Sequence, residues 1–243
     1  MINFFSVKFL PISACVLVAL TATSMPVLGE SVDVLITSEL LPAACTPVLG
    51  SGGSVDYGYI LAGSLSVNAF NPLPIKQIAF SINCDTPAKV AIRTLNGRVG
   101  SLAGSNESAQ GIGLNPTPLF GTASGFPVAG LGRDGTTKIG GYAARVMPGS
   151  LTTDGVAADG IFSRSSGTPT SWSVDNLSGT LFTSFSGQYL YRTWASLGTV
   201  DPIAFESLNC VLEVQAYLNR AADLDLGHAI TLDGLATIEI VYL

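Results

Sequence analysis

Apolar and polar residues alternate with a period of two in several segments, and this pattern predicts β-strands that bury one face. In the first clear segment, one face is formed by Ile78, Phe80, Ile82 and Cys84. Residues 85–87, Asp-Thr-Pro, are typical of a turn and are expected to lead the chain into a following strand. Residues 140–146 repeat the alternation more weakly, because two glycines interrupt it. Both segments are therefore predicted to be half-buried strands.

Two further strands are predicted towards the C-terminus. Residues 210–218 place four apolar side chains on the same face as Cys210. The longest alternation follows, and its inward positions are Ile230, Leu232, Gly234, Ala236, Ile238, Ile240 and Tyr242. Most of the intervening positions are polar, with Leu235 and Val241 as the exceptions. A strand of this length needs a second layer beneath it to bury its apolar face.

Turn-forming residues fill the segments between the predicted strands. Residues 100–135 and 148–178 are rich in glycine, proline, serine and asparagine, and no window keeps a helical period. No internal repeat is visible, and no linker divides the chain. We therefore predict an all-β protein with one antiparallel β-sandwich domain over residues 30–243, carrying long loops.

The first 29 residues have the order of a secretory signal peptide. One basic residue precedes an apolar stretch from Phe9 to Leu20, and small and polar residues follow. Cleavage is predicted after Gly29, so that the mature chain starts near Glu30. The protein is therefore expected to be exported to the periplasm, the cell surface or both.

Two alternatives for this segment stay open. An uncleaved membrane anchor is less favoured, because Pro11 interrupts an apolar stretch that is shorter than the ~20 residues a span needs. Residues 12–15, Ile-Ser-Ala-Cys, resemble a lipobox, but most of the apolar stretch would then remain on the mature protein. No integral membrane span is predicted in the mature chain.

Composition and charge narrow the range of functions. Only 12% of the residues are charged, which suits short strands better than long amphipathic helices. The formal net charge is −6, so the chain offers no basic surface for DNA or RNA. No nucleic-acid partner is predicted.

Three cysteines remain after the predicted cleavage. Cys45 and Cys84 are close enough in sequence to form a disulfide, and an oxidising compartment would preserve it. Closing a loop of about forty residues would stabilise the fold by about 3 to 4 kcal/mol. Cys210 is expected to be buried as a small hydrophobic residue.

No catalytic or metal-binding pattern stands out. His228 is the only histidine, which excludes a histidine-rich zinc site, and no G-x-S-x-G motif accompanies it. The glycines of residues 111–116 lack the context of a dinucleotide-binding loop. Asp223, Asp225 and Asn219 form at most a partial calcium loop. We predict no catalytic residue, no metal and no cofactor, and that the protein is not an enzyme.

An aromatic-rich run spans residues 182–194. Such side chains can line a sugar-binding surface, but they also fill the cores of β-sandwiches. Core or loop packing is the favoured interpretation.

Three landmarks follow one another along the mature chain. A cysteine lies soon after the mature start in residues 41–47, and another ends an alternating strand in residues 80–84. An alternating C-terminal strand with a penultimate tyrosine comes last. Together they resemble fimbrial subunits of the chaperone-usher type. The GltF-like branch of exported, fimbria-related proteins is more similar still, through Ala44-Cys45-Thr46-Pro47, residues 52–58 and a Leu232-Asp233-Gly234 turn.

The resemblance implies a fold and a mode of assembly. Fimbrial subunits are immunoglobulin-like (pilin-type) sandwiches that lack one strand, so that a groove exposes apolar core. A periplasmic chaperone, and later a neighbouring subunit, would supply the missing strand. The docking edge would be Ile230, Leu232, Gly234, Ala236, Ile238, Ile240 and Tyr242. The donor strand would be residues 30–36, offering Val32, Val34 and Ile36.

Two features depart from the fimbrial pattern. The donor segment is short, and Ile230 stands where such subunits usually have a glycine. We predict a fimbrial-like structural or accessory subunit of a surface appendage, with an adhesive role included in that expectation. Its partners would be a periplasmic chaperone, an usher and neighbouring subunits. The alternatives are a self-complete periplasmic binding module of unnamed ligand and, third, an exported carbohydrate-active enzyme.

Overall fold

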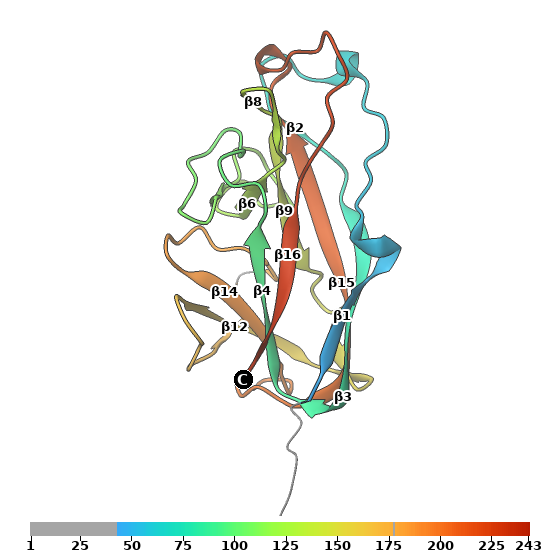
Figure 1. The fold of residues 1–243 in the computed structure, drawn as a ribbon, viewed down its shortest axis with the longest axis vertical. Coiled ribbons are helices and arrows are strands. Elements are labelled where there is room, and N and C mark those ends of the chain that lie inside the picture. Colours follow the sequence, from blue (N-terminus) through green and yellow to red (C-terminus); the bar gives the residue numbers. More distant parts are fainter. Residues whose placement is uncertain (1–42, 177) are drawn as a thin grey trace, which may run out of the picture. The chain divides into compact units, whose positions relative to one another are not determined.

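The computed structural model describes residues 43–176 and 178–243. The predicted signal peptide and donor strand fall within residues 1–42 and lie outside the described residues. Strands make up 46% of the structure and helices 5%, so the protein is all-β, as predicted. The strands pair antiparallel in sheets that form a sandwich consistent with an immunoglobulin-like fold (Figure 1).

The larger sheet has nine strands, with the long strand β15 at its centre between β3 and β9. Its main path runs β1 (Cys45–Leu49), β3 (Lys76–Ala88), β15 (Phe205–Leu218), β9 (Gly140–Val146), β6 (Pro127–Gly130) and β5 (Ile112–Leu114). The shorter strands β2 (Asn71–Pro72), β10 (Thr152–Thr153) and β11 (Val156–Ala157) attach beside this path.

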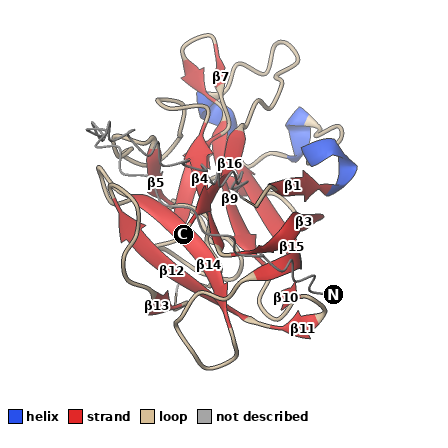
Figure 2. Cartoon of the chain, turned by 60° about the horizontal axis from the view of Figure 1, so that its bottom comes forward, coloured by secondary structure: helices blue, strands red, loops and turns tan. Residues whose placement is uncertain are grey.

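The smaller sheet has five strands, and β16 is one of its two edges. In order, they are β13 (Ser173–Val174), β12 (Asp159–Ser165), β14 (Tyr189–Ala195), β4 (Val90–Asn96) and β16 (Ala236–Tyr242). A separate hairpin joins β7 (Arg133–Asp134) to β8 (Thr137–Lys138). Figure 2 shows how few helical turns accompany the strands, namely η1 (Gly50–Gly53), η2 (Ala62–Ser64) and η3 (Ala221–Asp223). Within the described part of the chain, no helix has the length and apolar character needed to cross a membrane.

The main core lies between the two sheets and is built on the predicted alternations. The rings of Trp194 and Phe205 meet edge to face with centroids 5.6 Å apart, and both are almost fully buried. Phe182 is buried against Tyr142 in the same way. The aromatic run 182–194 therefore supplies core packing, as favoured from the sequence, although Phe185 is exposed.

A second, smaller core covers the outer face of the larger sheet. Four buried residues from the region that the sequence marked as loop pack there against Ala143 of β9 and Tyr217 of β15: Leu102, Leu119, Phe126 and Val128. The Tyr217 hydroxyl donates to the carbonyl of Ala103 at 2.7 Å, which anchors this cover to the sheet. Residues 100–135 are therefore not only loop, because they include β5, β6 and most of this cluster.

The predicted disulfide is present. Cys45 and Cys84 are bonded, and they are also direct partners in the β1–β3 ladder. Cys210 is the one free cysteine among the described residues and is 5% exposed. Burial raises the pKa of its thiol to about 12, so it stays protonated and unreactive.

The turn predicted at residues 85–87 is wrong. Strand β3 continues through them to Ala88, and β4 begins at Val90 in the other sheet. The ladder between β3 and β15 shifts register between Phe205 and Ser207. This bulge accommodates the proline, which has no N–H to offer to a ladder.

The last strand is shorter than its alternation predicts. Strand β16 covers only the second half of the predicted segment, because residues 230–234 are held elsewhere. The N–H of Asp233 donates to the carbonyl of Leu131 at 3.0 Å. The Arg98 guanidinium binds both the carboxylate and the carbonyl of Asp233. These contacts replace the ladder with β4 over this stretch.

Candidate functional site

The two sheets leave an opening on the side where their edge strands β1 and β16 lie. We call this side the seam. The N–H of Cys45 donates to the hydroxyl of Tyr242 at 2.8 Å, which joins the two edges at one end. Beyond this contact, a cavity of about 380 Å³ opens between the sheets. It is lined by side chains from both.

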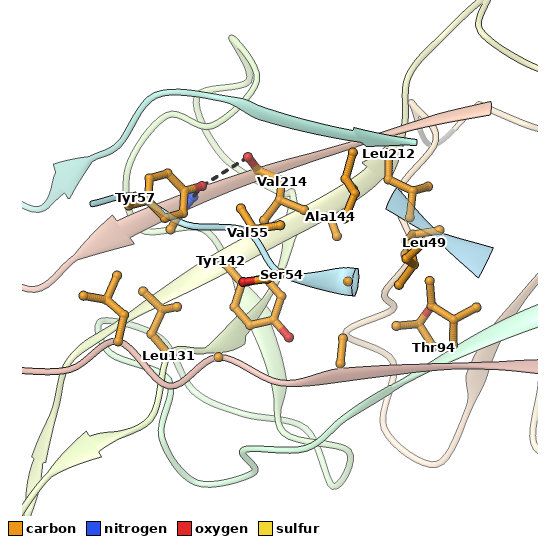
Figure 3. A pocket seen from close by; sticks show the side chains of 18 residues that line it. Leu49, Ser54, Val55, Tyr57, Thr94, Leu131, Tyr142, Ala144, Leu212 and Val214 are labelled. Carbon is orange, nitrogen blue, oxygen red and sulfur yellow. Dashed lines mark hydrogen bonds between the residues drawn. The ribbon is translucent and has the colours of Figure 1, made fainter. Parts of the chain in front are cut away.

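The lining of this cavity is mainly apolar. Figure 3 shows the residues that line it, and the apolar ones include Leu49, Val55, Tyr57, Leu131, Ala144, Leu212, Val214, Leu232 and Ile238. The Tyr57 hydroxyl donates to the carbonyl of Val214 at 3.2 Å and accepts from the N–H of Ala216 at 3.1 Å. These two bonds hold the non-strand segment after η1 against β15 as one wall of the cavity.

A second cavity of about 210 Å³ shares Leu232 with the first. Its walls include Ile60 and Leu65 on one side and Leu226 and Ile230 on the other. The two cavities together form an apolar groove along the seam, between residues 49–65 and residues 224–238. We call it the seam groove.

Strand β16 has a free backbone edge along this groove. The N–H of Gly97 donates to the carbonyl of Leu235 at one end of the β4–β16 ladder. At the other end, the N–H of Leu243 donates to the carbonyl of Lys89. The backbone N–H and C=O groups of successive residues in a strand point to opposite sides. The odd-numbered residues between Leu235 and Leu243 therefore also face β4. The residues whose N–H and C=O groups face away from β4 are Ala236, Ile238, Ile240 and Tyr242.

No strand within the described part of the chain pairs with this second side of β16. A row of unpaired N–H and C=O groups is a template for another strand. The side chains of Ile238 and Ile240 turn inward and pack against the main core while remaining partly exposed. The edge therefore combines free backbone groups with accessible apolar side chains.

Two hydroxyl groups interrupt the apolar lining, one from each sheet. Thr94 on β4 is 9% exposed and Tyr142 on β9 is 7% exposed, and both line the larger cavity (Figure 3). Among the described residues, neither hydroxyl has a hydrogen-bond partner. Burial raises the pKa of Tyr142, so its phenol keeps its proton. A buried hydroxyl without a partner costs about 1 to 3 kcal/mol.

The predicted docking-edge residues all lie on the segment that borders the seam. Those lining the seam groove are Ile230, Leu232, Gly234, Ala236 and Ile238. Ile240 and Tyr242 continue along β16 towards the contact with Cys45. Their docking role stays a prediction, and Val32, Val34 and Ile36 lie outside the described residues.

The sequence prediction missed the opposite wall and the two hydroxyls. A signal for the wall existed, since Val55 and Tyr57 alternate within residues 52–58, which served only as a family landmark. Thr94 and Tyr142 carry no such signal, because a hydroxyl in a strand is ordinary until its neighbours are known.

His228 lies on an exposed loop and not in a catalytic arrangement. Its Nε2 is 2.9 Å from a carboxylate oxygen of Asp134, and its Nδ1 is 3.6 Å from one of Asp225. Asp223, which was considered for a calcium loop, instead binds the guanidinium of Arg220 at 2.7 Å. In the described parts of the chain, no group of three His, Cys, Asp or Glu residues is placed to hold a metal ion.

The hydrogen bond to Asp134 raises the pKa of His228 above its ordinary value, with smaller charge effects from Asp134 and Asp225. The protonated imidazole therefore stabilises the fold below the ordinary pKa, and this contribution is lost as the pH rises through the raised value. We expect Asp134→Asn to lower the pKa of His228. Because the chain has a single histidine, an NMR titration can follow it directly. A pKa of His228 unaffected by Asp134→Asn would contradict the assignment.

The fold and the seam groove define an all-β sandwich whose two sheets are open along one edge. A family model described as "Protein of unknown function (DUF1120)" matches residues 34–143. The chain is 28% identical over 222 residues to the uncharacterized protein YhcF of Escherichia coli K12, covering 88% of this chain and 90% of the relative. It is 26% identical over 261 residues to protein GltF of the same organism, covering 99% and 100%. The chain is thus a distant homologue of both. No solved structure gives a significant match.

Proposed function

We propose that the protein is a fimbrial-like structural or accessory subunit of a surface appendage, assembled by strand donation. The observation that carries the proposal is the free edge of β16 beside the apolar seam groove. A strand added there would pair with the backbone groups of Ala236, Ile238, Ile240 and Tyr242. Its alternate side chains would enter the groove and complete the core.

The order of sequence landmarks supports the same proposal. The cysteine pair, the residues 52–58 element and the C-terminal alternating segment resemble the GltF-like branch of fimbria-related proteins, and GltF is among the relatives. Export to the periplasm or cell surface, a non-enzymatic role, and a chaperone, an usher and neighbouring subunits as partners all belong to this proposal. Contact with a host or another surface through the loops would add adhesion.

Self-association of the chain beginning at Glu30 tests the proposal. Chains refolded together are expected to form concentration-dependent oligomers in sedimentation velocity. Ile240→Ser combined with Tyr242→Ser should weaken these oligomers, because both inward side chains lie on the free edge. Val241→Ser, which changes a side chain on the opposite face of β16, is the matched control. A monomer at every concentration, insensitive to these changes, would rule out assembly by strand donation.

A self-complete periplasmic binding module is the second candidate. The larger cavity, at about 380 Å³, lies within the range of about 300 to 1,000 Å³ usual for small-molecule sites. Calorimetric binding of a small solute by a monomer, abolished by Tyr142→Ala, would favour this candidate over assembly.

A further inference from the structure

Thr94 and Tyr142 set a chemical requirement on whatever fills the seam groove. An entirely apolar strand that closed the groove would keep both hydroxyls buried and unpaired. Such groups carry a desolvation cost that only a hydrogen-bond partner offsets. The best-fitting occupant is therefore an apolar strand that carries one short polar side chain at the level of these hydroxyls.

Both hydroxyl-bearing residues lie beside the middle of the seam. A Cβ placed on Gly234 would be 3.2 Å from the ring of Tyr142, so this ring packs under Gly234. Thr94 is the ladder partner of Ile238. Between these two residues, the C-terminal wall of the groove is formed by Gly234, which has no side chain, and Ala236, which has only a methyl group. This part of the groove therefore has room for a side chain from an added strand.

The segment before the fold has a matching pattern. Its inward face would carry Val32, Val34, Ile36, Ser38 and Leu40. Glu30 begins this face, and Ser38 is its only polar member between Val32 and Leu40. A hydroxyl can donate one hydrogen bond while accepting another. The opposite face carries Asp33 and Glu39, which would remain in solvent.

We propose that residues 30–40 of a second copy of this chain fill the seam groove, with Ser38 hydrogen-bonded to Thr94 and Tyr142. The inference rests on the strand-donation function proposed above. It extends the donor beyond the predicted residues 30–36 and gives its polar residue a role in fixing the register. Eleven extended residues span about 36 Å, against about 24 Å for the seven residues of β16, so the donor is long enough to cover the whole free edge of β16.

A second copy is a better donor than the chain itself. The backbone N–H of Cys45 donates a hydrogen bond to the hydroxyl of Tyr242, so the chain enters the fold beside the end of β16. For its own residues 30–40 to fill the groove, the chain would have to reverse closely at Leu41-Pro42. Proline fixes φ near −65° and favours an extended residue before it, which excludes the tight turns of a hairpin. A wider turn would take Ser38 and Leu40 out of the strand.

A double-mutant cycle on the chain beginning at Glu30 tests this register. Sedimentation equilibrium is expected to show association about tenfold weaker for Ser38→Ala, because two hydroxyls lose their partner. In the Thr94→Val, Tyr142→Phe background, Ser38→Ala should have no further effect. Ser31→Ala, on the opposite face of the donor, should leave association unchanged in both backgrounds. Tyr142→Phe alone, which removes one oxygen atom, gives a second cycle if the double variant does not fold.

The outcomes separate this inference from the function on which it rests. If Ser38→Ala weakens association equally in both backgrounds, or does not weaken it in either, the proposed register is wrong and strand donation is unaffected. A monomer whose stability falls with Ser38→Ala at all concentrations would show that the chain fills its own groove, which overturns the second-copy donor. If the chain does not associate and its stability does not change with Ser38→Ala, the proposed function itself is wrong.

Discussion

Replacing Cys45 and Cys84 together by serine is expected to lower the free energy of unfolding by about 4 kcal/mol. The disulfide closes a loop of 39 residues, and cross-links of this span restrict the unfolded chain by about that amount. Strand β1 has little else to hold it, because it lies at a sheet edge and its three middle residues are exposed. Urea denaturation of the double serine variant and of the oxidised parent chain measures the difference.

Cys210→Ala is the matched control for this result. It removes a buried thiol without removing a cross-link, and a loss of about 1 to 2 kcal/mol is expected from the small cavity. Reduction of the parent chain should reproduce the loss seen with the double serine variant. A loss below about 1 kcal/mol in the double variant would show that β1 is held mainly by other contacts.

Val34→Asp is expected to weaken self-association at least about 100-fold. In a donated strand, the new carboxylate would be buried in the apolar seam groove without a partner, and an unpaired buried charge costs several kcal/mol. The substitution leaves every side chain of the two sheets unchanged, so the free energy of unfolding of the monomer should stay the same. Sedimentation velocity over a range of concentrations measures the association.

Leu35→Asp is the matched control, because it adds the same charge one residue further along the chain. In a strand, its side chain points to the opposite face and stays in solvent. Association should therefore change little. Equal weakening by both substitutions would indicate a general effect of charge and would contradict insertion of an alternating strand.

The sequence predicted the parts of the fold that depend on burial of one strand face. The alternations in residues 78–84, 140–146 and 210–218 lie in β3, β9 and β15, because each of these strands has one face against the core. The disulfide followed from spacing and compartment. Short strands such as β5 and β6 escaped prediction, since they form by pairing with distant segments and carry little pattern of their own.

Other features could not be predicted because they depend on contacts between distant residues. The turn expected after Cys84 is replaced by a bulge, which only the partner strand β15 defines. The buried Arg192 binds the carboxylate of Asp175 at 2.6 Å, and no sequence pattern indicates this pair, whose members are 17 positions apart. Asp233 likewise ends the C-terminal alternation early through its contact with Arg98.

The candidate site was predicted in part. Alternation and family resemblance indicated the residues of the C-terminal edge, and the structure shows which of them border the seam groove. The sequence could not predict that the hydroxyls of Thr94 and Tyr142 lack hydrogen-bond partners, because this depends on which groups the opposite sheet places near them. The same two hydroxyls now indicate which side chain a donor strand should carry.

A disulfide trap between two copies tests strand donation most directly. Chains carrying Ile36→Cys are refolded under oxidising conditions with chains carrying Ile238→Cys, while the native Cys210 stays buried. The account predicts a covalent dimer of one chain of each kind, identified by mass spectrometry, and no such dimer when Leu35→Cys replaces Ile36→Cys. Absence of the covalent dimer, or an equal yield of it with Leu35→Cys, would contradict strand donation between copies.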